Sequence, residues 1–157
     1  YLETYRLLMR ADSPLAGRKS LSWAEVGQQP LCLLSSDMQN RRIVDRLLAA
    51  AGIASAPMVE SNSIIVLVSH VLTGRWMSVV PGKLADHFAA RGELAAVPIE
   101  DTGTGAAKAD QGRRQDPGGQ QVGLVVAQRD PHTPMLQALI DLAGALERKR
   151  LQPASDR

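Results

Sequence analysis

Two polar stretches lie where strand-like apolar runs give way to helical patterns, and their side chains are the best candidates for ligand binding. Together we call them the rim: Ser35, Ser36, Asp37, Met38, Gln39 and Asn40 in the first stretch, and Glu60, Ser61, Asn62 and Ser63 in the second. Hydroxyl and amide groups supply neutral donors, and the free N–H groups at the start of a helix favour a carboxylate or another small anion. If the two preceding strands are neighbours, the stretches lie side by side and form one edge of a binding site.

A purely structural interpretation competes for the same residues. Ser36 and Gln39 have the spacing of a capping box, and Asn62 has the position of a cap for the next helix. The sequence alone leaves both interpretations open.

The elements that position the rim alternate between strand-like and helical patterns, which indicates an α/β fold with mostly parallel strands. We expect strands at 5–9, 31–34, 76–80, 94–99 and 121–128, and helices at 37–51, 64–72, 84–90 and from Pro134, which Thr133 caps. A capping box, Ser22 with Glu25, predicts one further helical turn that ends at Gly27. The β-branched residues of 64–72 favour a strand. Gly74 and the crossover that two parallel strands require favour a helix, which we predict.

Other residues with reactive side chains lack the partners that catalysis or metal binding needs. Cys32 lies in an apolar run without a neighbouring base, and His70, His87 and His132 have no second ligand at metal spacing. The segment 103–108 imitates part of a phosphate loop, but Ala109 occupies the position of the required Ser or Thr. We therefore expect no enzyme activity, no metal and no cofactor.

Composition narrows the class of protein further. The 157 residues are 45% apolar and suffice for one domain with an aliphatic core, and a formal charge of +2 is too small to indicate nucleic-acid binding. A single cysteine excludes an internal disulfide and favours a reducing compartment. The longest apolar run, 64–68, is far shorter than the roughly 20 residues of a membrane span. The segment 102–120 is polar and glycine-rich, so we expect a disordered loop there.

The chain contains several short motifs in an order that resembles that of the effector-binding domain of LysR-type transcriptional regulators. These motifs are ADSPLA at 11–16, LSWA at 21–24, PLCLL at 30–34, the helical pattern at 41–52, VESNS at 59–63, VVP at 79–81, VPI at 97–99 and GLV at 123–125. DMQNRR at 37–42 with TGRW at 73–76 further resembles a subgroup whose genes lie beside formate dehydrogenase genes.

The resemblance implies a type 2 periplasmic-binding-protein-like fold, with a small effector bound between two lobes. Residues 1–21 and 93–150 would belong to an incomplete first lobe, residues 22–92 to the second lobe, and residues 151–157 to a tail. An N-terminal winged helix-turn-helix and the start of the first lobe are absent from the pattern, which implies a truncated chain. It also implies DNA binding only through that absent domain, self-association of the full-length protein, and a cytoplasmic location without membrane contact.

Family members contact effectors with the segment that matches 36–40. The alternative from another class is a type 2 solute-binding protein of a transporter, which an upstream signal peptide would indicate.

Overall fold

The computed structural model describes residues 2–100, 120–127 and 131–151 and divides the chain into two units. The larger unit is Glu3–Gln120, and the smaller unit combines Tyr1–Leu2 with Gln121–Arg157.

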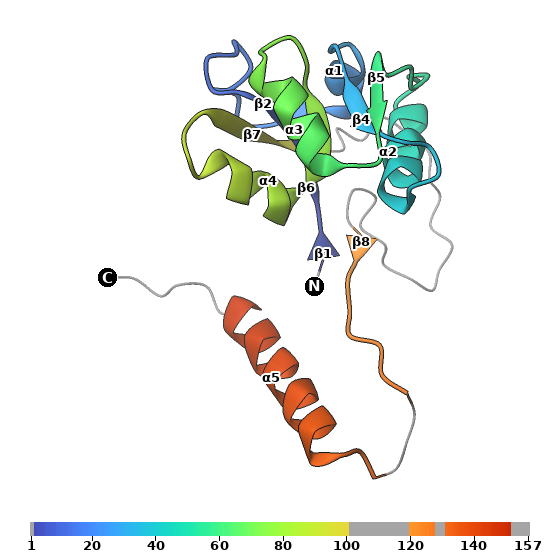
Figure 1. The fold of residues 1–157 in the computed structure, drawn as a ribbon, viewed down its shortest axis with the longest axis vertical. Coiled ribbons are helices and arrows are strands. Elements are labelled where there is room, and N and C mark those ends of the chain that lie inside the picture. The colour runs from blue at the N-terminus through green and yellow to red at the C-terminus, as the bar shows by residue number, and fades with distance from the viewer. Residues whose placement is uncertain (1, 101–119, 128–130, 152–157) are drawn as a thin grey trace. The chain divides into compact units, whose positions relative to one another are not determined.

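A four-stranded mixed sheet forms the centre of the larger unit (Figure 1). Its order is β3 (Leu21–Ser22), β7 (Leu94–Glu100), β2 (Tyr5–Arg10) and β6 (Ser78–Pro81). β2 runs antiparallel to β6 and β7, whereas β3 and β7 are parallel. The prediction of mostly parallel strands is therefore wrong for both pairings of β2. This antiparallel strand is buried on both faces, so its apolar run is continuous like that of a parallel strand.

A second, parallel pair of strands precedes the two helices that start at the rim. β4 (Cys32–Leu34) pairs with β5 (Val59–Ser61), with Leu34 opposite Ser61. A single parallel bridge between Leu31 and Met77 connects this pair to β6.

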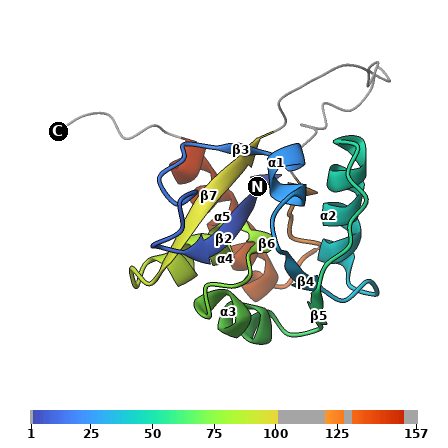
Figure 2. The same cartoon turned by 90° about the horizontal axis from the view of Figure 1, so that it is seen from above.

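Helices cover both faces of these strands (Figure 2). They are α1 (Trp23–Gly27), α2 (Gln39–Ala50), α3 (Ile64–Leu72) and α4 (Gly82–Ala89). The predicted helix over 64–72 and the capping box of Ser22 with Glu25 are confirmed. The helix predicted from residue 37 begins two residues later, at Gln39.

Gly52 ends α2 in the way that its sequence position predicts. Its φ of 78° is in the left-handed region that glycine adopts without steric cost. The Gly52 N–H donates to the Ala49 carbonyl, and the Ile53 N–H donates to the Leu48 carbonyl. These two bonds are those of a Schellman motif, which satisfies carbonyls that the helix leaves free.

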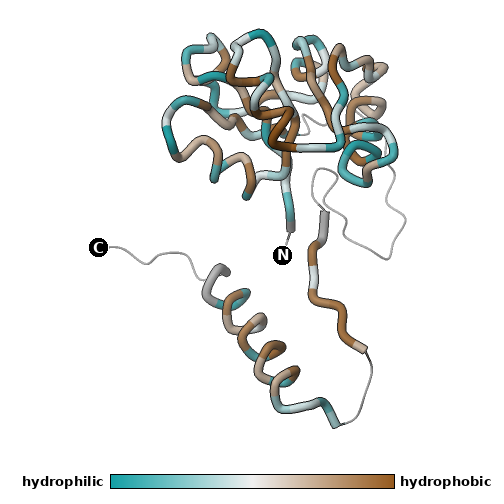
Figure 3. The backbone as a smooth tube through the Cα atoms, viewed as in Figure 1, coloured by the Kyte–Doolittle hydropathy of each residue, from teal (hydrophilic) through white to brown (hydrophobic). Residues whose placement is uncertain are grey.

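The core consists of two apolar clusters, one on each face of the strands. Side chains alternate along β4, so that Leu33 joins the cluster of α1 and α2, whereas Cys32 and Leu34 join the cluster of α3 and α4. Figure 3 shows α3 as largely hydrophobic. β4 is thus buried on both faces.

The remaining elements include short strands and one long helix. β1 (Leu2–Glu3) and β8 (Gln120–Gln121) form a two-stranded sheet, and α5 (Pro134–Leu151) is the helix of the smaller unit. The Thr133 hydroxyl accepts from the Leu136 N–H at 3.4 Å, as its predicted capping role requires.

Two predictions on this part of the chain have different outcomes. The strand predicted over 121–128 is wrong, because 122–127 has no regular structure and β8 ends at Gln121. Apart from Gln120, which lies in β8, the loop predicted at 102–120 is outside the described residues. The lobe boundaries stay a prediction.

Candidate functional site: two helix starts at one edge of the strands

The structure brings the two polar stretches of the rim together. The parallel pairing of β4 with β5 places the carboxyl ends of both strands at the same edge. Beyond the ladder, the Ser35 N–H donates to the Ser61 carbonyl at 3.0 Å. The predicted juxtaposition of the two stretches is therefore confirmed, whereas their contact with a ligand stays a prediction.

Neither helix at the rim begins with a side-chain cap. The N-cap of α2 is Met38 and that of α3 is Ser63, and neither side chain accepts a bond from its helix. Instead, the Ser61 hydroxyl accepts from the Ser63 N–H at 3.1 Å, ahead of α3. The capping roles considered for Ser36 and Asn62 are thus wrong, and first-turn N–H groups of α2 and α3 stay without side-chain caps.

The side chains of the rim differ in their access to solvent. Among the predicted site residues, the exposed ones are Ser36, Asp37, Gln39 and Asn62, and the half-buried ones are Ser35, Met38, Asn40, Ser61 and Ser63. Within the described residues, the buried Ser35 hydroxyl has no hydrogen-bond partner. Because buried polar atoms are rarely left without one, Ser35 is a rim residue whose side-chain hydrogen-bonding capacity is not used by the described part of the protein.

Arg41 is a functional candidate that the sequence analysis did not single out. Its side chain is only 6% exposed and lies directly behind the rim. It donates to the Leu34 carbonyl at 2.7 Å, to Glu60 at 2.7 Å and to Asp45 at 2.8 Å. The only signal in the sequence was the i, i+4 spacing of Arg41 and Asp45, which is common on exposed helix faces.

The two carboxylates beside Arg41 outnumber its single positive charge. Burial alone would lower the pKa of the Arg41 guanidinium, but the bonds to Asp45 and Glu60 outweigh burial and raise it. One cation therefore faces two carboxylates, and Arg41 adds no unneutralised positive charge to the rim.

Asn40 connects the rim to the central sheet. The Tyr5 hydroxyl, at the start of β2, donates to the Asn40 side-chain oxygen over a long 3.5 Å. Burial is the main cause that raises the pKa of Tyr5, so this hydroxyl stays protonated and able to donate at neutral pH. The carboxyl edge of the strands thus includes a donor from β2.

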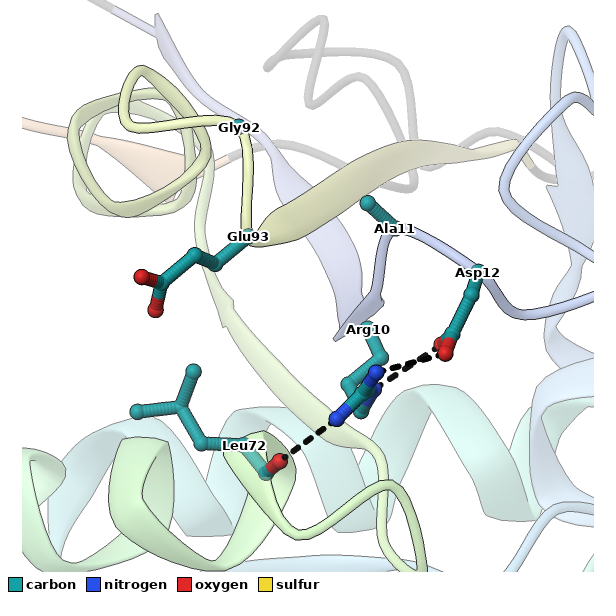
Figure 4. Close-up of a pocket in the computed structure, with 6 residues that line it drawn as sticks. All are labelled: Arg10, Ala11, Asp12, Leu72, Gly92 and Glu93. Carbon is teal, nitrogen blue, oxygen red and sulfur yellow. Dashed lines mark hydrogen bonds and ion pairs between the residues drawn. The ribbon is translucent and has the colours of Figure 1, made fainter.

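A hollow of about 440 Å³ lies at the far end of β2, away from the rim (Figure 4). Its lining residues are Arg10, Ala11, Asp12, Leu72, Gly92 and Glu93. Arg10 forms two bonds with Asp12, of 2.9 and 2.6 Å, and these bonds lower the pKa of Asp12. Because Arg10 also donates to the Leu72 carbonyl, its donors serve the protein itself, and we do not assign this hollow a ligand.

The other reactive side chains do not form a centre. Burial raises the pKa of the Cys32 thiol to about 11, so Cys32 is inert at neutral pH. In the part of the chain that the structure describes, no group of three His, Cys, Asp or Glu residues is placed to hold a metal ion. None of the described helices has both the length and the apolarity to cross a membrane.

The larger unit, with helices that begin along one polar edge of its strands, has a periplasmic-binding-protein-like α/β fold. Residues 1–147 match the family model described as the LysR substrate binding domain. The chain belongs to this family. No curated protein sequence is significantly similar to it.

Solved structures of LysR-family regulators resemble the chain. The reduced OxyR regulatory domain from Pseudomonas aeruginosa is 25% identical, with a TM-score of 0.53 over 65% of this chain and 49% of that chain. A crystal structure of the reduced form of OxyR is 19% identical, with a TM-score of 0.62 over 99% of this chain and 64% of that one. The effector binding domain of QuiR in complex with shikimate is 16% identical, with a TM-score of 0.55 over 66% of this chain and 48% of that one.

The chain spans 32% to 49% of the length of the first solved structures that it matches.

Proposed function

We propose that this chain is the effector-sensing part of a LysR-type transcriptional regulator and that its rim binds a small anionic molecule. The observation that supports this most directly is the placement of two uncapped helix starts at adjacent strand ends. N–H groups at helix starts favour a carboxylate, and the unpartnered Ser35 hydroxyl adds a neutral donor. The QuiR domain was solved with shikimate, which carries a carboxylate and hydroxyl groups, and such a ligand suits the same donors.

The proposed regulator includes parts beyond these 157 residues. A full-length OxyR from Pseudomonas aeruginosa matches the chain over 32% of its own length, which leaves room for a DNA-binding domain and for the rest of the effector domain. We propose that a winged helix-turn-helix there binds DNA in the cytoplasm, and that the full-length protein self-associates. An effector held between residues 22–92 and a first lobe would shift the equilibrium between arrangements of the DNA-binding domains. Catalysis is not part of this proposal.

The finer assignment concerns the effector. DMQNRR at 37–42 and TGRW at 73–76 support membership of the subgroup encoded beside formate dehydrogenase genes, which makes formate the first anion to test. Sequencing of the genes beside the natural coding sequence tests this assignment directly. The absence of formate dehydrogenase genes among them would contradict it.

A thermal-shift titration of the full-length regulator tests the proposed function. We expect formate, acetate or shikimate to raise the melting temperature, because a ligand at 100 times its dissociation constant adds about 2.7 kcal/mol to the free energy of unfolding. Formamide and acetamide are matched neutral probes and should have little effect. Equal shifts with the acids and the amides, or no shift with any carboxylate, would contradict the proposal.

A further inference from the structure

Arg41 bonds to one residue of the rim and to two residues next to it from one position on α2. It lies in the first turn of this helix, and its guanidinium donates to Asp45 on the same helix, to the Leu34 carbonyl at the end of β4 and to Glu60 on β5. All three distances are 2.7 to 2.8 Å, as expected for strong bonds from a cation. One side chain therefore connects the start of α2 to both strand ends.

The planar fork of an arginine suits this arrangement. The bond to the Leu34 carbonyl satisfies a buried backbone acceptor just before the polar stretch begins. The bond to Glu60 holds the residue before Ser61, from which the second stretch continues. A lysine has a single nitrogen at the end of its chain, so it cannot reproduce this set of directions.

Arg41 is placed to position the rim and not to contact a ligand. Its side chain is 6% exposed, whereas that of Glu60 is 44% exposed. Its charge is paired with those of Asp45 and Glu60, and its bonds are made within the protein. A ligand on the rim would meet the two polar stretches that Arg41 holds.

We propose that Arg41 is the positioning residue of the rim: it fixes the separation of the α2 start from the end of β5, and the rim binds its ligand only when this separation is held. The first half of this inference stands on the contacts above, and the second half rests on the proposed function.

Amide hydrogen exchange of the full chain, with Arg41→Lys and Arg46→Lys, tests the positioning role. Arg46 is exposed on the same helix, so its substitution is a matched control. We expect Arg41→Lys to accelerate exchange of the hydrogen-bonded amides of Ser35, Met38 and Ser63 at least about tenfold relative to Leu8 in the central strand β2. Without the bonds from Arg41 to Leu34 and Glu60, local opening of the rim costs less free energy. Arg46→Lys should leave this ratio unchanged. Equal acceleration at all sites, or none at the rim, would overturn the proposal.

Glu60→Gln provides a milder variant if Arg41→Lys fails to fold. It keeps an acceptor near Arg41 but removes the charge, so we expect faster exchange at Ser63 and a smaller change at Ser35 and Met38. A response confined to Ser35 and Met38 would overturn the proposal, because Glu60 is the link to the second stretch.

Binding of sodium acetate to the full-length regulator separates this inference from the proposed function. If the wild-type protein binds acetate, Arg41→Lys should weaken acetate binding at least about tenfold, and Arg46→Lys should weaken it less than about twofold. Equal acetate binding by the two variants would overturn the inference. Where wild type binds no carboxylate, the proposed function fails, and the exchange experiment alone decides the positioning role of Arg41.

Discussion

Replacing Asn62 by Asp places a negative charge at one of the two helix starts and changes little else. Asn62 is exposed, lies two residues before the first residue of α3, and has nearly the same shape as Asp. The substitution therefore separates the effect of charge at the rim from the effects of packing.

Two effects of opposite sign follow from this position. A carboxylate near the start of a helix stabilises it by about 0.3–1 kcal/mol, so the melting temperature should rise by about 2–6 °C for a unit of this size. The same carboxylate repels a bound anion about 4 Å away by about 1 kcal/mol at a hydrated site, which weakens binding about fivefold.

Calorimetry of the full-length regulator measures both quantities, as a scan without ligand and as a titration with acetate. Ser69→Asp is the matched control, because Ser69 is exposed near the end of α3, where a negative charge is unfavourable. A stabilised Asn62→Asp protein that binds acetate as tightly as wild type would refute the placement of the anion at α3. A destabilised Asn62→Asp protein would refute the uncapped start of this helix.

Four further predictions concern the scaffold of the larger unit. Cys32, with its pKa raised to about 11, should react with iodoacetamide at pH 8 at least about 100-fold more slowly in the folded than in the unfolded protein. The thiol ionises near pH 9.0 in the unfolded protein and only near pH 11 in the folded protein. The free energy of unfolding should therefore fall as the pH rises from 9 to 11. A Cys32→Ala variant that loses the same stability over this range would contradict the prediction. Ser22→Ala should lower the free energy of unfolding in urea by about 1 kcal/mol, since it removes the capping box of α1, and an unchanged midpoint would argue against that cap. Gly74→Ala should lower the free energy of unfolding by about 1–2 kcal/mol in the same assay. The φ of Gly74 is 75°, and the new Cβ would lie 2.9 Å from the Arg10 side chain. Gly17→Ala is the control, because its Cβ would meet no atom within 4 Å and the substitution should be nearly neutral.

The sequence predicted those features of the fold that depend on local patterns. α3 was identified against its strand propensity, because Gly74 and the need for a crossover both required a helix there. The capping box of Ser22 and the left-handed Gly52 likewise depend on residues within a few positions of each other. Features decided by distant partners were not predicted: the antiparallel direction of β2 depends on β6 and β7, about 70 to 90 positions away.

The candidate site shows the same division. The two polar stretches were predicted because each lies between a strand and a helix, and their juxtaposition followed from the parallel pairing of those strands. The buried position of Arg41 was not predicted, because its acceptors Leu34 and Glu60 lie 7 and 19 positions away. The caps considered at Ser36 and Asn62 do not form, because α2 and α3 begin later, after Met38 and Ser63.

The narrow connection between β4 and β6 has a mechanical consequence. Only two backbone hydrogen bonds cross it in the described residues, from the Cys32 N–H to the Met77 carbonyl and from the Met77 N–H to the Pro30 carbonyl. A full ladder of bonds resists sliding along its whole length, whereas two bonds resist it at one point. The backbone bonds between β4 and β6 therefore resist sliding only at Met77, and the resistance of the rest of this junction comes from the two apolar clusters that both sets of strands share.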